Sequence, residues 1–233
     1  MSQTLVIPRR FCGPPDSGNG GWTCGSLAQH LEGQVEVTLR RPPPLGRPLE
    51  ITHLAEGLVL SDEGALVAEA TLANLDLEQP QPVPASIAAE ATKGYKGFEH
   101  HIFPTCFTCG PERAEHDGLR IFAGPVTGRP HTVADCWTPD ASLSDTDGMV
   151  PEPIVWAALD CPSGWVHLGD GVVALLGRMT ARLHSKVEAG VPYVVVAESA
   201  GAEGRKRYSR SALFTGEGEA VAVARATWIV VER

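Results

Sequence analysis

The sequence has few of the features that mark several classes of protein. Its 233 residues include 6 cysteines, and 19 Lys and Arg stand against 28 Asp and Glu, a formal net charge of −9. So few cysteines do not make a disulfide scaffold, and we expect reduced thiols. The shortage of basic residues argues against nucleic acid or a membrane surface as partner, because both are bound through an excess of Lys and Arg.

Long apolar runs are also missing. None approaches the roughly 20 residues that span a bilayer, and residues 1–8 lack the basic start and apolar stretch of a signal peptide. We therefore expect a cytoplasmic protein. What the chain does have is 43% apolar residues with 25 Gly and 19 Pro, the composition of one large folded domain or two small ones.

The positions of Gly, Pro and apolar residues predict helices and strands in two similar series. In the first series, Trp22, Leu27 and Leu31 have helical spacing and Gly33 is placed to cap the helix. Strands are predicted around 35–39, 49–51, 58–60 and 65–73. In the second series, a helix opens at Pro151, passes through Asp160 and is expected to end at Pro162. Strands are predicted at 119–122, 132–137, 172–183, 193–197, 208–214 and 220–231.

Short stretches of the two series also match in sequence and in the same order. The segment 46–49 (GRPL) matches 190–193 (GVPY), and 67–71 (VAEAT) matches 223–227 (VARAT). Leu27-Ala28-Gln29 overlays Ala158-Leu159-Asp160. Ordered matches of this kind favour an internal duplication. We expect an N-terminal repeat at 1–75, a connector at 76–104 and a C-terminal repeat at 105–233.

A helix followed by antiparallel strands, present twice, resembles the hotdog fold, in which a curved sheet wraps a central helix. The segment 106–110 (CFTCG), followed by 117–122 (DGLRIF), is similar to the opening of thioesterase-superfamily domains, and Ala158-Leu159-Asp160 is similar to their helix. The resemblance implies an α+β tandem (double) hotdog. The chain departs from that pattern at Gln29, where an acid would stand, and at Glu152-Pro153, where paired glycines would stand.

Asp160 is the residue on which the expected chemistry depends. It follows an apolar run in the second helix, and a carboxylate there must be paired, solvated by a cavity or raised in pKa. We predict Asp160 as base or nucleophile, with helix-start amides from Val150 to Pro153 stabilising an oxyanion. The alternative is an exposed Asp160 near the helix end. Gln29 either holds a water or carbonyl through its amide or is a helix-surface residue.

Two further groups are candidates for binding substrate. Asn19, Gly20 and Gly21 could present amides to a ligand at a helix N-terminus, or form a structural turn. Arg205, Arg207 and Arg210 form the densest basic cluster and could hold the phosphates of coenzyme A, or form a solvated hairpin base. Arg40 and Arg41 are a weaker version of the same idea.

Cys106 and Cys109 have the spacing of a zinc-binding pair, with His100, His101 and His116 near them in sequence. A second cysteine pair is missing and the histidines lack the usual spacing. We therefore expect no metal and no cofactor, and keep Cys106 and Cys109 as weak candidates. A redox dithiol and a buried structural turn are the other interpretations.

Together these observations predict an acyl-CoA thioesterase-like hydrolase, in which a carboxylate assists the attack of water on a thioester. The expected partner is acyl-CoA or another acyl thioester. The alternative is a non-catalytic hotdog module that binds acyl-CoA or a similar acyl ligand. Because sheet edges commonly associate, we expect a homodimer.

Overall fold

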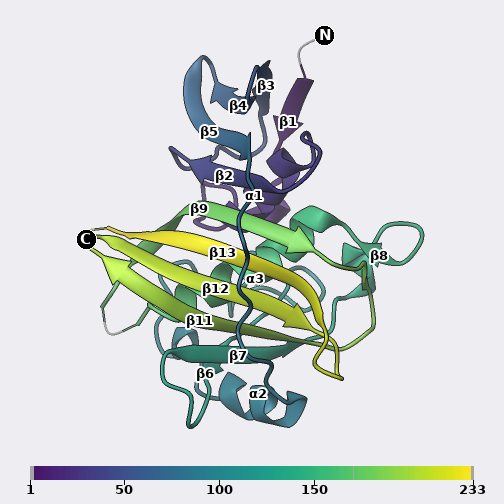
Figure 1. The fold of residues 1–233 in the computed structure, drawn as a ribbon, viewed down its shortest axis with the longest axis vertical. Helices are drawn as coiled ribbons and strands as arrows, with labels where there is room; N and C mark the ends of the chain where they lie inside the picture. The colour runs from purple at the N-terminus through teal and green to yellow at the C-terminus, as the bar shows by residue number, and fades with distance from the viewer. Residues whose placement is uncertain (1–2, 170, 232–233) are drawn as a thin grey trace.

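The computed structural model describes residues 3–169 and 171–231, and its main feature is one curved antiparallel sheet (Figure 1). Eleven strands form this sheet: β1 (Gln3–Val6), β2 (Val35–Leu39), β3 (Pro48–Leu54), β4 (Gly57–Asp62), β5 (Ala65–Leu72), β6 (Gly124–Pro125), β7 (Thr132–Trp137), β9 (Ala174–Leu183), β11 (Tyr193–Glu203), β12 (Lys206–Phe214) and β13 (Ala220–Val230). A separate short pair joins β8 (Met149–Val150) to β10 (Val187–Glu188). The helices are α1 (Gly20–Ala28), α2 (Ala85–Thr92) and α3 (Glu152–Trp165), with 3-10 turns at Arg9–Phe11, Lys96–Phe98 and Ala141–Leu143.

The strand order is the same on either side of one central pairing. The sheet runs β1-β3-β4-β5-β2-β9-β13-β12-β11-β7-β6, and β2 pairs with β9 at its middle. Outward from β2 come β5, β4 and β3, and outward from β9 come β13, β12 and β11. The backbone ladder between β2 and β9, from Val35 opposite Ala181 to Thr38 opposite Arg178, makes the two series one continuous sheet.

Different helices pack against the two faces of the sheet. The largest buried cluster contains residues of α1 and α3 together with residues from the strands, among them Val195 and Leu213. Their neighbours Val194 and Phe214 point the other way and pack in a second cluster with Ala88 of α2. Residues 73–84 run across this outer face before α2 (Figure 1). Coverage on both faces explains why these strands are apolar at consecutive positions.

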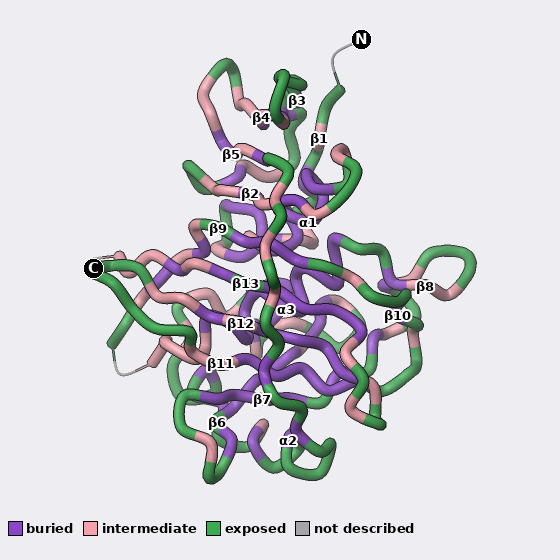
Figure 2. The backbone as a smooth tube through the Cα atoms, in the orientation of Figure 1, coloured by how far each residue is buried: buried purple, intermediate pink, exposed green. Residues whose placement is uncertain are grey.

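Buried backbone is concentrated where the two helices meet the strands (Figure 2). α1 and α3 are packed so closely that two glycines of α1 are required. A Cβ on Gly21 would lie 2.5 Å from the Cβ of Asp160, and one on Gly25 would lie 2.7 Å from the Cα of Pro153. Since Gly21 faces the middle of α3 and Gly25 faces its start, the two helices run in opposite directions.

Most of the predicted elements are confirmed. The strands predicted at 35–39, 49–51, 58–60, 65–73 and 132–137 are present, as are the four predicted between 172 and 231. The predicted helix around Trp22 and Leu31 is present but ends at Ala28. The predicted connector at 76–104 contains a helix that the sequence analysis did not predict, α2, which the prolines around it had hidden.

Two predictions about local structure were wrong. Residues 119–122 are not a strand of the sheet, because Arg120 has a left-handed φ of 52° and Ile121 N–H donates to Thr108 O in a neighbouring loop. Pro162 does not end α3, which continues to Trp165. A hydroxyl group of β12 donates a hydrogen bond to a carbonyl of α3 near this proline, from Ser211 Oγ to Leu159 O at 2.9 Å. Such side-chain donors let a helix continue past a proline.

Among the described residues, no helix is both long and apolar enough to cross a membrane.

Replacing Gly25 tests the close approach of the helices. We expect Gly25→Ala to lower the free energy of unfolding by about 1–3 kcal/mol, because the new methyl overlaps Pro153. This reverses the gain of about 1 kcal/mol that alanine normally brings to a helix. Denaturant unfolding measures the difference. Gly216→Ala, where nothing lies within 4 Å of the added Cβ, is the control and should change stability by less than about 0.5 kcal/mol. A Gly25→Ala protein as stable as the wild type would contradict the packing.

Candidate functional site

A cavity of about 670 Å³ lies between the start of α1, the second half of α3 and strands β9 and β13. The loop at 40–43 and the segment after α2 complete its wall. Much of the lining is apolar, from Phe103, Trp165, Leu168, Leu176, Trp228 and Ile229. Among the polar lining residues, Asn19, Asp160 and three cysteines come together at one place. An apolar pocket with a few converging polar groups is the usual form of a small-molecule site.

Asp160 is buried in the wall of this cavity, with 2% of its surface exposed. Its Oδ2 accepts a hydrogen bond from the backbone N–H of Gly21 at 2.8 Å. Its Oδ1 has no hydrogen-bond partner among the described residues. The carboxylate therefore joins the middle of α3 to the first turn of α1 through one of its two oxygens.

Burial raises the pKa of Asp160 to about 7, because the interior disfavours the charged form. The N–H of Gly21 opposes this rise, the nearby Cys106 adds to it, and the amide of Asn19 opposes it. A carboxylate with a pKa in this range accepts and releases a proton near neutral pH, which is what a general base requires. The only other carboxylate among the buried described residues, Asp135, accepts from Thr92 Oγ1 and Phe122 N–H and does not line the cavity.

The first turn of α1 presents backbone N–H groups at the same place. Asn19 is the N-cap, and its Oδ1 accepts from Trp22 N–H at 2.9 Å. Its Nδ2 donates to Thr108 Oγ1 at 3.3 Å, which holds the cap to the neighbouring loop. Gly20 and Gly21 begin the helix, where N–H groups lack intrahelical acceptors and the helix dipole is positive. This arrangement favours negative charge beside Asp160.

Three buried cysteines lie against this polar group. Cys106 and Cys109 come from the loop after α2, and Cys161 comes from α3 next to Asp160. The thiols of Cys109 and Cys161 hydrogen-bond the Cys106 sulfur and hold the pKa of Cys106 below its usual range. Burial raises the pKa of Cys109. All six cysteines are described and none is in a disulfide, as expected.

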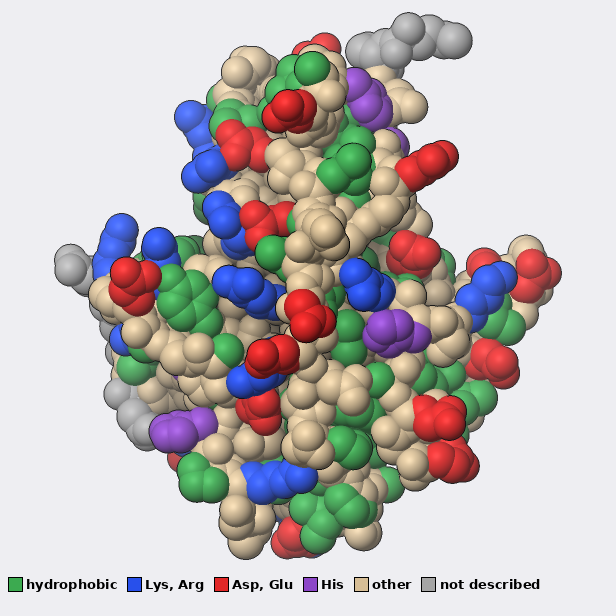
Figure 3. Space-filling model, viewed as in Figure 1, with side chains coloured by type: hydrophobic (Ala, Val, Ile, Leu, Met, Phe, Trp, Pro, Cys, Tyr) green, Lys and Arg blue, Asp and Glu red, His purple; other side chains and the backbone are tan. Residues whose placement is uncertain are grey.

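Basic side chains occur at the cavity, but they are not the predicted cluster. Arg40, Arg41 and Lys96 contribute to the lining, with Arg41 exposed. Arg205, Arg207 and Arg210 do not line it. Arg210 forms ion pairs with Glu198 and Glu78, and in the view of Figure 3 acidic and basic side chains alternate over the sheet face rather than forming a basic patch.

The structure places the remaining predicted residues as follows. Asn19, Gly20 and Asp160 line the cavity together, and Gly21 is hydrogen-bonded to Asp160. Gln29 is the exposed C-cap residue of α1 and does not line the cavity. Val150 pairs with Val187 in the β8–β10 ladder, and also lies outside the lining. The N–H groups that face Asp160 therefore belong to α1 and not, as predicted, to the start of α3.

Cys161, Thr108 and Trp165 are parts of the site that the sequence analysis missed. Cys161 directly follows Asp160, but its distance of 55 residues from Cys106 hid the relation between them. The sequence contained one signal of this relation. A third cysteine directly follows the predicted functional acid, in a helix expected to face a cavity.

Comparison with known proteins supports the fold. No protein-family model and no curated protein matches the chain. Among solved structures, a candidate thioesterase from Novosphingobium aromaticivorans is 11% identical, with a TM-score of 0.62 over 98% of this chain and 95% of that one. A tesB protein from Mycobacterium avium subsp. paratuberculosis is 14% identical, with a TM-score of 0.61 over 98% of this chain and 91% of that one.

A third structure is described by its fold alone. It is a conserved protein of unknown function with a hotdog fold from Alicyclobacillus acidocaldarius, 12% identical, with a TM-score of 0.60 over 100% of this chain and 93% of that one. These likenesses cover nearly the whole chain. The expected hotdog fold is therefore confirmed.

Replacing Asn19 tests the link between α1 and the loop that carries Cys106. We expect Asn19→Ala to lower the free energy of unfolding by about 1–2 kcal/mol, because it removes the N-cap acceptor. It also leaves the buried Thr108 hydroxyl without its amide donor. Asn19→Ser keeps a capping oxygen and should lose less. Denaturant unfolding compares the variants, and an alanine variant as stable as the serine variant would contradict the capping role.

Proposed function

We propose that this hotdog protein hydrolyses acyl thioesters, with acyl-CoA as the substrate class and Asp160 as the general base. The observation that carries the proposal is a buried carboxylate in the wall of an apolar cavity. One of its oxygens has no hydrogen-bond partner among the described residues, and the other contacts the first turn of a second helix. An apolar cavity accommodates an acyl chain, and a base beside helix-start N–H groups is what attack on a thioester carbonyl requires.

The mechanism follows from the two helix segments. Asp160 Oδ1 holds a water molecule, whose oxygen attacks the carbonyl carbon while its proton passes to the carboxylate. The carbonyl oxygen becomes an oxyanion, stabilised by the N–H of Gly20 and by the positive end of the α1 dipole, while the N–H of Gly21 stays on Asp160 Oδ2. The carbon–sulfur bond then breaks, the thiolate takes the proton from Asp160, and the acid and thiol leave.

We also infer that the chain arose as a tandem hotdog, with the repeats and connector at the boundaries that the sequence suggests. The mirrored strand order about the β2–β9 ladder and the antiparallel contact of α1 with α3 support this. A second, symmetric site would need an acid at Gln29 and N–H groups at the start of α3. Gln29 is exposed, and Pro151 and Pro153 have no N–H. On this proposal, the described residues provide one such site and not two.

Basic side chains that line the cavity favour a substrate whose carrier bears phosphate groups, such as coenzyme A. Arg40 and Arg41 follow β2 at the rim, near Lys96 and His100. Arg40 is paired with Glu69 at 2.7 Å, which leaves Arg41 as the better candidate for a phosphate. Arg205, Arg207 and Arg210 do not line the cavity and are not part of the proposed site. The homodimer and the cytoplasmic location stay predictions.

Replacing Asp160 tests the proposed base. We expect Asp160→Asn to lower kcat by about 10²–10⁴-fold, because the amide keeps an acceptor for Gly21 N–H but cannot accept the proton of water. Release of free thiol from acyl-CoA substrates of several chain lengths measures the rate. Gln29→Ala is the matched control and should turn over substrate at the wild-type rate.

Two outcomes would decide against this mechanism. Equal thiol release by the wild-type and Asp160→Asn proteins would remove Asp160 from it. If the folded wild-type protein binds acyl-CoA but releases no thiol at any chain length, the chain is instead a non-catalytic acyl-CoA-binding module, the other function that the sequence suggested.

Replacing Arg41 tests whether the protein recognises the phosphate groups of the substrate's carrier. We expect Arg41→Ala to raise KM for an acyl-CoA roughly two- to fivefold with little change in kcat, since an exposed cation contributes less than about 1 kcal/mol. KM for the matching acyl thioester of N-acetylcysteamine, which has no phosphate, should not change. Arg182→Ala, at an exposed cation that does not line the cavity, is the control and should leave both KM values unchanged. Equal KM effects on the two thioesters would contradict phosphate recognition at Arg41.

A further inference from the structure

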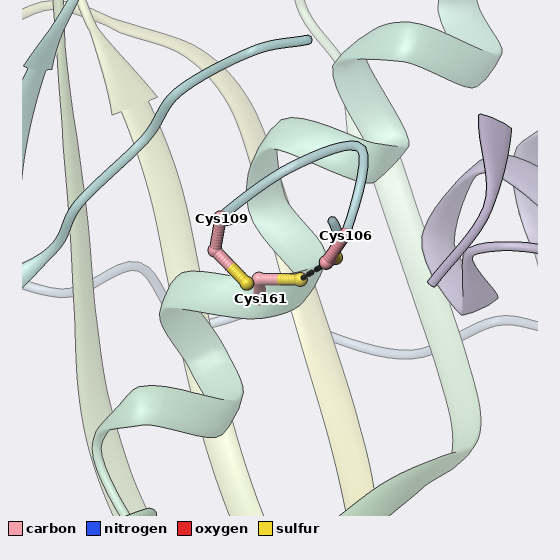
Figure 4. A group of neighbouring side chains, drawn as sticks. All are labelled: Cys106, Cys109 and Cys161. Atoms are coloured by element: carbon pink, nitrogen blue, oxygen red, sulfur yellow. Dashed lines mark hydrogen bonds between the residues drawn. The ribbon is translucent and has the colours of Figure 1, made fainter. Parts of the chain in front are cut away.

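The three cysteines at the cavity have the spacing of ligands to a single metal ion. Their sulfur atoms all lie within 4.8 Å of one another, and the sulfurs of Cys106 and Cys161 are 3.7 Å apart (Figure 4). A tetrahedral zinc ion with Zn–S bonds of about 2.3 Å places its sulfurs about 3.8 Å apart. The side chains come from two segments, the loop after α2 and helix α3, and lie next to one another (Figure 4).

The groups around these sulfurs are N–H donors, which suit thiolates better than neutral thiols. Asn19 Nδ2 lies 3.9 Å from the Cys106 sulfur and 3.8 Å from the Cys161 sulfur, within hydrogen-bond range for sulfur. Buried thiolates this close repel one another unless a cation lies between them. The donors therefore indicate an anionic sulfur group built around a cation.

His101 extends this set of donors rather than acting as a ligand. Its Nδ1 accepts a hydrogen bond from Phe103 N–H at 3.0 Å, so the proton of the neutral ring is on Nε2. Nε2 is 3.3 Å from the sulfur of Cys109 and donates to it. Donors to metal-bound ligands orient them and tune the affinity of the site.

The loop that carries Cys106 and Cys109 is long and lacks secondary structure. Residues 99–123 contain no helix or strand, yet residues 106–110 are all buried. Long segments without secondary structure are uncommon within compact domains unless they serve a function. A metal ion shared with Cys161 would fasten this loop to α3.

We propose that Cys106, Cys109 and Cys161 bind one zinc ion as thiolates, with the fourth coordination position facing the cavity. Binding releases three thiol protons to solvent and gives a complex with one net negative charge, near the donors of Asn19 and His101. Three sulfurs this close accommodate a single ion, and thiolates are soft ligands that zinc binds well. The proposal replaces the expectation of no metal and does not depend on thioester hydrolysis.

The ion would also hold the proposed catalytic groups in place. Asn19 caps α1 and contacts two of the sulfurs, while Cys161 follows Asp160 on α3. A zinc ion at this point links the start of α1, the cysteine loop and α3. Its removal should therefore loosen the contact between the first turn of α1 and Asp160 and lower the free energy of unfolding.

The test is metal analysis of the full chain, purified under reducing conditions without chelator or affinity metal. We expect about one zinc ion per chain, or uptake of that amount by apoprotein given zinc chloride. X-ray absorption of the zinc protein should show three sulfur neighbours at about 2.3 Å and one oxygen or nitrogen at about 2.0–2.2 Å. This measurement needs no variant, so poor folding of a mutant cannot obscure the result.

Variants distinguish ligands from donors. Cys106→Ser and Cys161→Ser should lose stoichiometric zinc, while Cys136→Ser, at the exposed cysteine, should keep it. His101→Phe should weaken zinc binding about 10–100-fold without abolishing it. No zinc in the purified protein together with no uptake would overturn the proposal. So would fewer than three sulfur neighbours, or a disulfide between any two of the three cysteines in freshly purified protein.

Discussion

The close contact between α1 and α3 is the constraint on which the rest of the structure depends. Gly21 and Gly25 remove the side chains that would keep the helices apart, so the backbone of α1 approaches the Cα and Cβ atoms of α3 directly. At ordinary helix spacing, a backbone N–H of one helix would not reach a carboxylate near the backbone of the other. The 2.8 Å bond from Gly21 to Asp160 exists because the glycines allow it.

That contact joins what stabilises the fold to what the site can do. Burial of Asp160 costs free energy, which the Gly21 N–H and the N-terminal end of α1 partly offset. Within the part of the chain that the structure describes, one carboxylate oxygen has no partner at the wall of an apolar cavity. A buried polar atom without a hydrogen-bond partner is expected at a functional site, because a fully hydrogen-bonded carboxylate would have no oxygen left with which to bind or activate a ligand.

The cysteine loop shows how a segment with little secondary structure can still be a fixed part of the site. Its backbone pairs with neighbouring segments, as in the bond from Phe107 N–H to Cys12 O, and Thr108 Oγ1 donates to Ala157 O of α3. The proposed zinc ion would add a bond between the same loop and the same helix. The ion would hold the loop, the cap of α1 and the middle of α3 in fixed positions relative to one another. The proposed base and the proposed oxyanion donor would then keep the same relative position.

The sequence by itself determined the local elements, because apolar period, glycine and proline act over a few residues. The alternation at 35–39 predicted β2 to the residue, and the apolar run before Asp160 correctly indicated a buried acid. Which groups face that acid was decided by tertiary structure. The start of α3 is adjacent in sequence, yet the start of α1, 139 residues away from Asp160, supplies the N–H. Likewise Cys161 joins Cys106 only when α3 packs against the loop. No periodicity along the chain reports such contacts, since they follow from how closely two helices pack and not from either helix alone.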